Sequence, residues 1–131
     1  MLFRSPLFDC LITGVGQMQC AAHLAAHLAT RQYDIAIQAG LAGSFSPHYA
    51  KRSVVIVEEE FLADLGAEAN GSYLDIAEMG FLEPDEYPFS RGRLKASREW
   101  VPEGIDLPFV RSVTVNRVLS DPRSIAWVAT K

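Results

Sequence analysis

A glycine turn between an apolar strand pattern and an uninterrupted helix pattern constrains the fold of this chain most strongly. Residues 8–15 (FDCLITGV) form a short apolar run that predicts a buried strand ending at the Gly14–Gly16 turn. Residues 17–31 are rich in alanine and leucine without glycine or proline, which predicts a helix. Residues 33–38 (YDIAIQ) predict a second strand. This order predicts a βαβ unit with parallel strands and a right-handed crossover.

A third strand and a long excursion follow. Residues 53–62 (SVVIVEEEFL) contain the continuous apolar run Val54–Val57, which is typical of a strand covered on both faces. Residues 63–90 are rich in Gly, Pro, Asp and Glu. They predict a long, partly ordered excursion with at most a short helical turn around residues 74–79.

The last third of the chain predicts two more strands and a helix. Residues 93–97 are a weak strand candidate, and residues 109–118 (FVRSVTVNRV), rich in β-branched side chains, are a better one. Ser120–Pro122 supplies a capping side chain and a proline at the first helical position, so residues 123–130 predict a helix. Because this helix has barely begun when the chain ends, we expect an incomplete sheet and a truncated domain.

Composition excludes several classes of protein. Of the 131 residues, 49% are hydrophobic and 21% charged, which is ordinary globular usage. A net charge of −4 gives no support to a nucleic-acid-binding protein, which normally carries a basic surface. No apolar run approaches the about 18 residues of a membrane span, and no signal peptide is recognisable. Cys10 and Cys20 make no disulfide framework, so we expect a cytoplasmic protein with reduced thiols.

Charge is unevenly distributed along the chain. Residues 58–86 carry ten acidic side chains and no Lys or Arg, and four basic side chains follow within residues 91–98. Our interpretation is a solvated acidic loop region beside a basic strand face. The alternative is a surface that selects against anionic ligands.

Two common ligand-site motifs are poorly supported. Gly14–Gly16 begins like a dinucleotide fingerprint, but Gln19 occupies the sixth position and Gln38, not an acidic residue, ends the second predicted strand. His23 and His27 share a helix face but lack a third ligand and the glutamate of a zinc-protease motif. We expect no metal and no cofactor, a tight strand-to-helix turn at the glycines, and a surface-exposed histidine face.

Four ordered motifs carry a more specific signal than any one of these features. They are Leu11–Gly16 (LITGVG), Ile37–Phe45 (IQAGLAGSF), Phe61–Glu68 (FLADLGAE) and Ser112–Asn116 (SVTVN). Together they resemble the nucleoside phosphorylase/hydrolase superfamily, which includes the MTA/SAH nucleosidases. Within it, the chain is most similar to the futalosine hydrolases of menaquinone biosynthesis.

The resemblance implies an α/β fold, a three-layer αβα sandwich around a mixed, partly closed sheet, of which residues 1–131 are a single partial domain. It implies hydrolysis of the N-glycosidic bond of a purine nucleoside. Futalosine would give hypoxanthine and dehypoxanthine futalosine. The ribose becomes cationic in an oxocarbenium-like transition state while the purine leaves with negative charge. The protein must therefore hydrogen-bond the base, hold the ribose hydroxyls and position a water.

The resemblance also implies a set of substrate-binding residues. The loop Gly40, Leu41, Ala42 and Gly43 should lie under the ribose, because glycine lets the backbone approach closely. Leu65 should line the pocket over the nucleoside. Val115 should pack on the purine face, and Asn116 should lie near the purine edge.

Structural alternatives stand beside these assignments. Leu41, Leu65 and Val115 could be ordinary core residues. For Asp64 and Glu68 we expect hydrogen bonds to loop amides rather than a part in the chemistry.

Water is favoured over phosphate as the nucleophile. Related phosphorylases carry an arginine near the end of the second strand to hold phosphate, and Gln38 stands there in this chain. The family's acidic residue that helps to activate water has no counterpart before Leu11. The Met-Glu motif that grips the ribose and the aspartate that serves the leaving purine would lie beyond Lys131. We therefore expect no catalytic residue in this chain, no activity of the chain alone, and marginal stability.

The expected partner is a small-molecule purine nucleoside, with no nucleic acid and no membrane, and the full-length protein should form a homo-oligomer. Two alternatives stay open. One is an MTA/SAH nucleosidase or a purine nucleoside phosphorylase relative, although the nucleosidases more often have a polar serine where Leu41 stands. The other is a non-catalytic α/β binding module that is complete at this length.

Overall fold

The structure is a computed structural model that describes residues 2–4, 8–69 and 72–131. The chain divides into two compact units, residues 1–40 and residues 41–131. In the described residues, no helix combines the length and the hydrophobicity that crossing a membrane requires.

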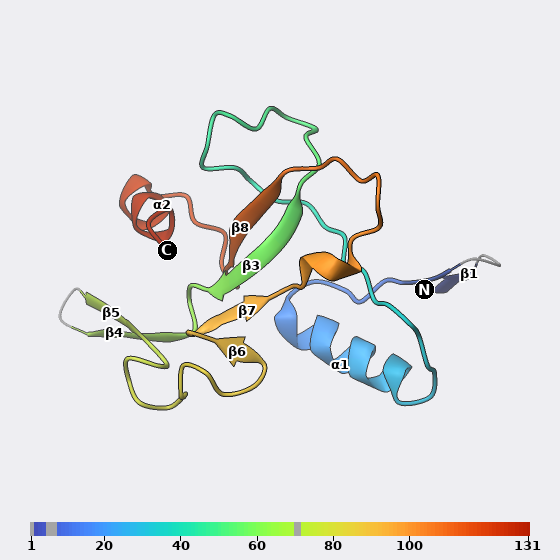
Figure 1. The fold of residues 1–131 in the computed structure, drawn as a ribbon. Coiled ribbons are helices and arrows are strands. Elements are labelled where there is room, and N and C mark those ends of the chain that lie inside the picture. The colour runs from blue at the N-terminus through green and yellow to red at the C-terminus, as the bar shows by residue number, and fades with distance from the viewer. Residues whose placement is uncertain (1, 5–7, 70–71) are drawn as a thin grey trace. The chain divides into compact units, whose positions relative to one another are not determined.

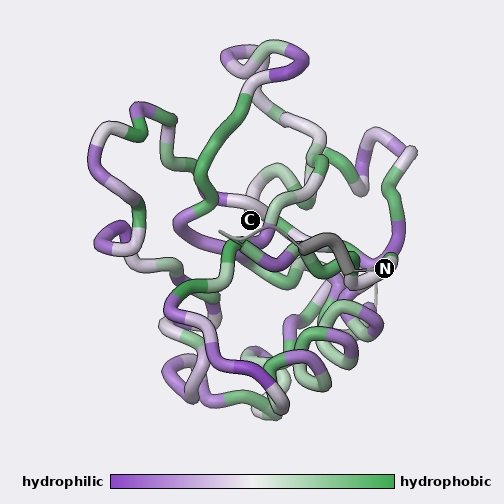
Figure 2. Tube along the Cα trace, turned by 90° about the vertical axis from the view of Figure 1, so that its right-hand side faces the viewer, coloured by the Kyte–Doolittle hydropathy of each residue, from purple (hydrophilic) through white to green (hydrophobic). Residues whose placement is uncertain are grey.

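The first unit contains a small antiparallel ribbon and one helix. Strand β1 (Leu2–Arg4) pairs with β2 (Asp9–Leu11), and helix α1 (Gln17–Leu28) follows (Figure 1). The prediction of this helix is confirmed. Apolar and polar residues alternate along its turns (Figure 2), and none of its residues is buried.

The turn into α1 needs its glycines. Gly14 and Gly16 have φ angles of +91° and +86°, the left-handed conformation that glycine adopts without steric cost. A Cβ on Gly14 would lie 2.5 Å from Oε1 of Gln19. That oxygen accepts a hydrogen bond from the backbone N–H of Val15 at 3.0 Å. The prediction of a tight strand-to-helix turn is therefore confirmed.

The predicted second strand, residues 33–38, is not a strand in this structure. Ile37 is 80% exposed and Ile35 46%, whereas a strand inside a sheet would have buried such apolar side chains. A strand needs the N–H and C=O groups of a neighbour, and β2 is paired antiparallel with β1 instead. The predicted parallel βαβ unit is therefore wrong for the described residues.

The second unit is built on a mixed four-stranded sheet. Its order is β6 (Phe89–Ser90), β7 (Arg93–Lys95), β3 (Ile56–Leu62) and β8 (Phe109–Thr114). β3 is central, antiparallel to β7 and parallel to β8 (Figure 1). The predicted strands at 53–62, 93–97 and 109–118 are confirmed with shorter bounds.

The start of the third predicted strand differs from expectation. β3 begins only at Ile56, and Val54 is 64% exposed. Residues 53–55 are not assigned to a strand. The prediction that the whole Val54–Val57 run is covered on both faces is therefore wrong.

Part of the predicted excursion is a β-hairpin. β4 (Gly66–Ala69) pairs antiparallel with β5 (Ser72–Asp75). A turn over residues 76–80 follows, in which the Asp75 carboxylate accepts hydrogen bonds from the N–H groups of Ala77 at 3.0 Å and Glu78 at 2.8 Å. The short turn expected around residues 74–79 is confirmed, whereas the hairpin before it was not predicted.

The 3₁₀ turn η1 (Arg98–Trp100) precedes β8, and helix α2 (Pro122–Val128) follows β8. The carboxylate of Asp121 accepts hydrogen bonds from the N–H groups of Arg123 at 3.0 Å and Ser124 at 3.2 Å. Asp121 therefore caps the helix, and Pro122 starts it, as predicted.

The core of the second unit lies where α2 packs on the sheet. Phe61 is 8% exposed, Ala63 0% and Val128 3%. Partly buried apolar side chains pack against these three, namely Val113, Val115, Leu119 and Trp127. The mixed sheet and the helices agree with the α/β class, and the three-layer sandwich stays a prediction.

Candidate functional site

The parallel pair of β3 and β8 brings two of the sequence motifs to one edge of the sheet. The Cα partners run from Ile56 opposite Phe109 to Leu62 opposite Thr114. Beyond them, the N–H of Ala63 donates to the Thr114 carbonyl oxygen at 3.0 Å. The residues that come next in the two motifs therefore leave the sheet at its carboxyl edge, where α/β proteins bind their ligands.

Asp64 and Asn116 are joined at this edge by two hydrogen bonds. The backbone N–H of Asn116 donates to Oδ2 of Asp64 at 2.5 Å, and Nδ2 of Asn116 donates to Oδ1 at 3.1 Å. Bonds to an ionised carboxylate are stronger than those between neutral groups. The expectation that Asp64 bonds a loop amide is confirmed. Its second bond, to the side chain of a predicted site residue, was not expected.

Val115 and Leu65 have different surroundings. Val115 is half-buried and packs against the core, as the structural alternative predicts. Leu65 is exposed and lines a small, mostly apolar hollow. The other residues around this hollow come from β3, from the last residue of β5 and from the chain that follows it, namely Phe61, Leu62, Asp75, Ile76, Ala77, Leu82, Phe89 and Gly92. The core alternative is therefore wrong for Leu65.

Gly66 connects the edge to the hairpin and admits no side chain. A Cβ there would collide with the carbonyl oxygen of Leu74 and would lie 2.7 Å from Oη of Tyr73. The glycine lets β4 and β5 approach directly after Leu65, and the backbone N–H of Ile76 donates to the Leu65 carbonyl oxygen at 3.2 Å.

Tyr73 lies on the hairpin side of the edge, and its pKa is shifted. Burial raises the pKa of Tyr73 above its ordinary value of 10.0, and the carboxylates of Asp64, Asp75 and Glu78 raise it further. Oη of Tyr73 is buried and makes no hydrogen bond with any described residue. The phenol of Tyr73 is thus a buried group whose pKa three carboxylates raise.

The predicted glycine loop makes few contacts in this structure. Gly40 ends the first unit and Leu41 begins the second. Leu41, Ala42 and Gly43 are all exposed, and a Cβ on Gly40 or Gly43 would meet no atom within 4 Å. The alternative that Leu41 is a core residue is therefore wrong. The assignment of this loop to the ribose stays a prediction.

The three consecutive glutamates of β3 are half-buried rather than solvated. Glu58 forms an ion pair with Arg98. Glu59 lies 3.4 Å from Arg93 and 3.8 Å from Lys95. Glu60 accepts a hydrogen bond from its cross-strand neighbour Ser112. The interpretation as a solvated acidic loop is wrong for these three, because basic side chains compensate the charge of two of them.

The histidine face of α1 carries hydrogen bonds instead of a metal cluster. Nδ1 of His23 lies 2.6 Å from the Thr13 carbonyl oxygen. Among the described residues, no group of three or more His, Cys, Asp or Glu side chains could hold a metal ion. Cys10 and Cys20 are free thiols.

Glu68, which we expected to hydrogen-bond a loop amide, is an exposed residue of β4. Its side chain makes no such hydrogen bond among the described residues.

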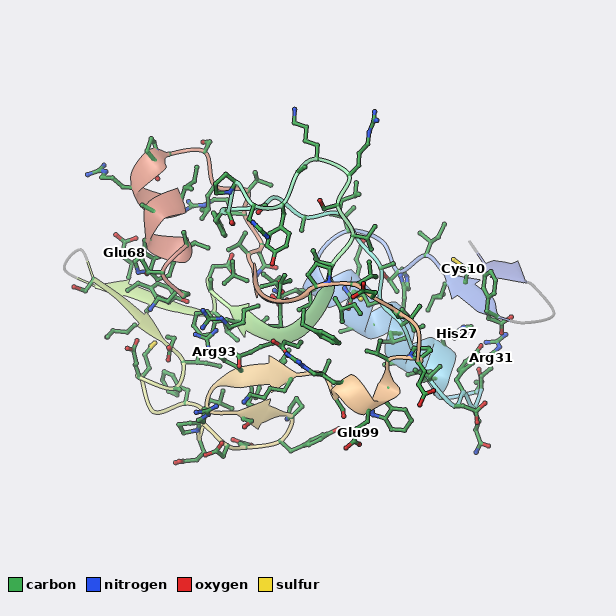
Figure 3. All side chains as sticks on the ribbon, turned by 45° about the horizontal axis from the view of Figure 1, so that its top comes forward. Cys10, His27, Arg31, Glu68, Arg93 and Glu99 are labelled. Carbon is green, nitrogen blue, oxygen red and sulfur yellow. The ribbon has the colours of Figure 1, made fainter. Side chains whose placement is uncertain are left out.

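A hydrogen-bonded network around His27 was missed by the sequence analysis. Nε2 of His27 lies 2.7 Å from Oη of Tyr33, which donates to Oδ2 of Asp9 at 2.7 Å. Nη1 of Arg31 lies 3.2 Å from Nδ1 of His27 (Figure 3). The four-residue spacing of His27 and Arg31 in the predicted helix, residues 17–31, is a signal for their contact, although α1 ends at Leu28. Nothing local indicates Asp9, which is 24 residues from Tyr33.

Comparison with known proteins finds a partial relative. The chain is 37% identical to the futalosine hydrolase of Streptomyces coelicolor over 79 residues. This match covers 56% of the chain and 34% of that hydrolase. The chain thus spans about a third of the length of this curated relative. No family model matches the chain, and no solved structure matches it.

Proposed function

We propose that this chain is part of a nucleosidase that hydrolyses the N-glycosidic bond of futalosine, releasing hypoxanthine and dehypoxanthine futalosine, in menaquinone biosynthesis. The observation that carries the proposal is the 37% identity to a futalosine hydrolase. It agrees with the resemblance of the four ordered motifs. The geometry supports it independently, because β3 and β8 bring two of those motifs to the carboxyl edge of a parallel strand pair.

The proposed roles follow from the position of each residue. Asn116 would hydrogen-bond the edge of the purine, Val115 would pack on its face, and Leu65 would cover the nucleoside. Gly40–Gly43 would support the ribose.

Hydrolysis requires groups that we place outside residues 1–131. They are the acid that activates water, the residues that grip the ribose hydroxyls and the aspartate that serves the departing purine. Each general acid or base of this kind typically contributes about 10²-fold or more to the rate. We therefore propose that the isolated chain is inactive, and that the completed protein binds a purine nucleoside as a homo-oligomer in the cytoplasm.

Hypoxanthine release is the direct test. The chain as given and the protein translated from the whole reading frame that contains it are incubated with futalosine, and the bases are separated by chromatography. We expect release by the longer protein without phosphate and none by residues 1–131. Release that depends on phosphate would identify a phosphorylase, and faster cleavage of methylthioadenosine would identify the alternative nucleosidase. No cleavage of any nucleoside by the longer protein would favour a non-catalytic module.

A further inference from the structure

The side-chain amide of Asn116 is held in one orientation. A carboxylate only accepts hydrogen bonds, so the amide group that faces Asp64 must be the Nδ2 donor. The orientation therefore follows from the chemistry of the partner and not from the assignment of amide oxygen and nitrogen. The other carboxylate oxygen is occupied by the backbone N–H of Asn116, which fixes Asp64 in turn.

The carbonyl oxygen of Asn116 is consequently turned away from Asp64. Asn116 is exposed, and no described residue donates a hydrogen bond to its Oδ1. This oxygen lies at the carboxyl edge of β3 and β8. The edge thus presents an oriented hydrogen-bond acceptor, whereas a freely rotating asparagine would offer a donor or an acceptor equally.

We propose that Asp64 is a positioning residue that makes Asn116 selective for a nucleobase with an N–H donor at its edge. This inference rests on the proposed function. The base of inosine, hypoxanthine, carries such a donor at N1. The base of purine riboside has a lone pair at N1, and two facing acceptors leave both without a hydrogen bond. A site built around a specific hydrogen bond discriminates strongly against an analogue that cannot form it.

Replacing Asp64 with asparagine gives a sharp expectation. In Asp64→Asn, the new amide oxygen can still accept from the backbone N–H of Asn116. Its new NH₂ group then faces the side chain of Asn116, which must turn its oxygen inward to pair with it. Asn116 would then present its own NH₂ group at the edge. The shape of the site is unchanged, but the acceptor has become a donor.

The first experiment needs no ligand. Side-chain amide resonances of Asn116 are recorded by ¹H–¹⁵N NMR in the 131-residue chain, in Asp64→Ala and in Asp64→Asn. Glu68→Gln, which removes an exposed carboxylate from the adjacent strand β4, is the matched control. We expect shifted, exchange-protected NH₂ resonances in the parent chain and in Glu68→Gln, and free-amide values in Asp64→Ala. Free-amide values in the parent chain would overturn the positioning role, whatever the site binds. Asp64→Asn provides the comparison if Asp64→Ala does not fold.

The second experiment measures selection. Inosine and purine riboside are titrated into the protein translated from the whole reading frame, with and without the same substitutions, and into its Asn116→Ala variant. We expect the unsubstituted protein and Glu68→Gln to prefer inosine by about tenfold, the effect of one net hydrogen bond. Asp64→Asn should reverse the preference and Asn116→Ala should abolish it. A merely structural Asp64 would weaken both ligands equally, and that result would overturn the proposal. If Asn116 is held as expected but neither nucleoside binds, the proposed function fails and so does the selectivity, leaving Asp64 as a structural anchor.

Discussion

The ring of Tyr73 in β5 meets the ring of Trp127 in α2 edge to face, with centroids 4.7 Å apart and planes inclined at 64°. This contact joins the β4–β5 hairpin to the helix that covers the core of the second unit. Both elements follow the candidate site in the chain, the hairpin after Leu65 and the helix after Asn116. The aromatic pair therefore fixes the two segments that leave the carboxyl edge.

Trp127→Ala should destabilise the second unit by about 2 kcal/mol. Trp127 is only partly buried, so the loss is smaller than the cost of truncating a fully buried tryptophan. It includes the loss of the aromatic pair with Tyr73. The measurement is urea unfolding followed by far-UV circular dichroism. Trp100→Ala is the control, because Trp100 is 65% exposed and its removal should cost less than about 0.5 kcal/mol. Equal effects of the two substitutions would show that Trp127 does not anchor the core.

Tyr73→Phe should leave stability unchanged or raise it slightly. The substitution keeps the ring on Trp127 and removes a buried hydroxyl that has no hydrogen-bond partner among the described residues. Removing an unsatisfied buried polar group removes its desolvation cost, which is about 1 kcal/mol or more. The midpoint of urea unfolding is the measurement. A clear loss of stability would mean that the hydroxyl has a partner.

The pKa of Tyr73 also predicts a loss of stability in alkali. Because the folded state raises this pKa above 10.0, the contribution of Tyr73 to stability is fully present below the unfolded pKa. It is lost as the pH rises through the folded pKa. The parent chain should therefore lose stability above about pH 10 more steeply than Tyr73→Phe does. Parallel curves for the two proteins would contradict the raised pKa.

Gly66→Ala should disrupt the hairpin, whereas Gly43→Ala should not affect folding. The new methyl group of the first variant would meet backbone and side-chain atoms of β5, and that of the second would meet nothing within 4 Å. Overpacking of this kind costs about 1–3 kcal/mol. Amide hydrogen exchange of residues 66–75 measures the effect on the hairpin.

In the completed enzyme, larger substitutions in the glycine loop test its part in function. Gly43→Val should reduce hypoxanthine release far more than Leu41→Ile does, if the glycine loop supports the ribose.

The sequence predicted those elements whose signals are local. Residues 17–28 form a helix without breakers, and Asp121 with Pro122 starts α2, as their residue types require. Residues 33–38 have a strand composition but are not a strand in the structure, because a strand depends on its neighbour. The β4–β5 hairpin has a local signal in the sequence. The sequence between its strands is Asn70-Gly71, the dipeptide most typical of tight hairpins.

In the candidate site, too, local features could be predicted from the sequence and contacts between distant residues could not. The resemblance selected Leu65, Val115 and Asn116, and the parallel register of β3 and β8 places them at one edge. No local signal could pair Asp64 with Asn116, because 52 residues separate them. Their contact follows from the strand register, which the sequence does not encode locally.

Asp121→Asn should make the acid stability of α2 less dependent on pH. The Ser124 hydroxyl, with the N–H groups of Arg123 and Ser124, lowers the pKa of the Asp121 carboxyl below its ordinary value of 3.8. A lowered folded-state pKa means that the stabilisation is fully present above the unfolded pKa and is lost as the pH falls through the folded pKa. Asparagine caps helices about as well as aspartate but does not titrate in this range. Amide exchange of residues 124–129, measured from about pH 5 down to about pH 2, should show protection that falls below pH 4 in the parent chain more than in Asp121→Asn. Identical pH profiles would show that the charge of Asp121 does not hold the start of this helix.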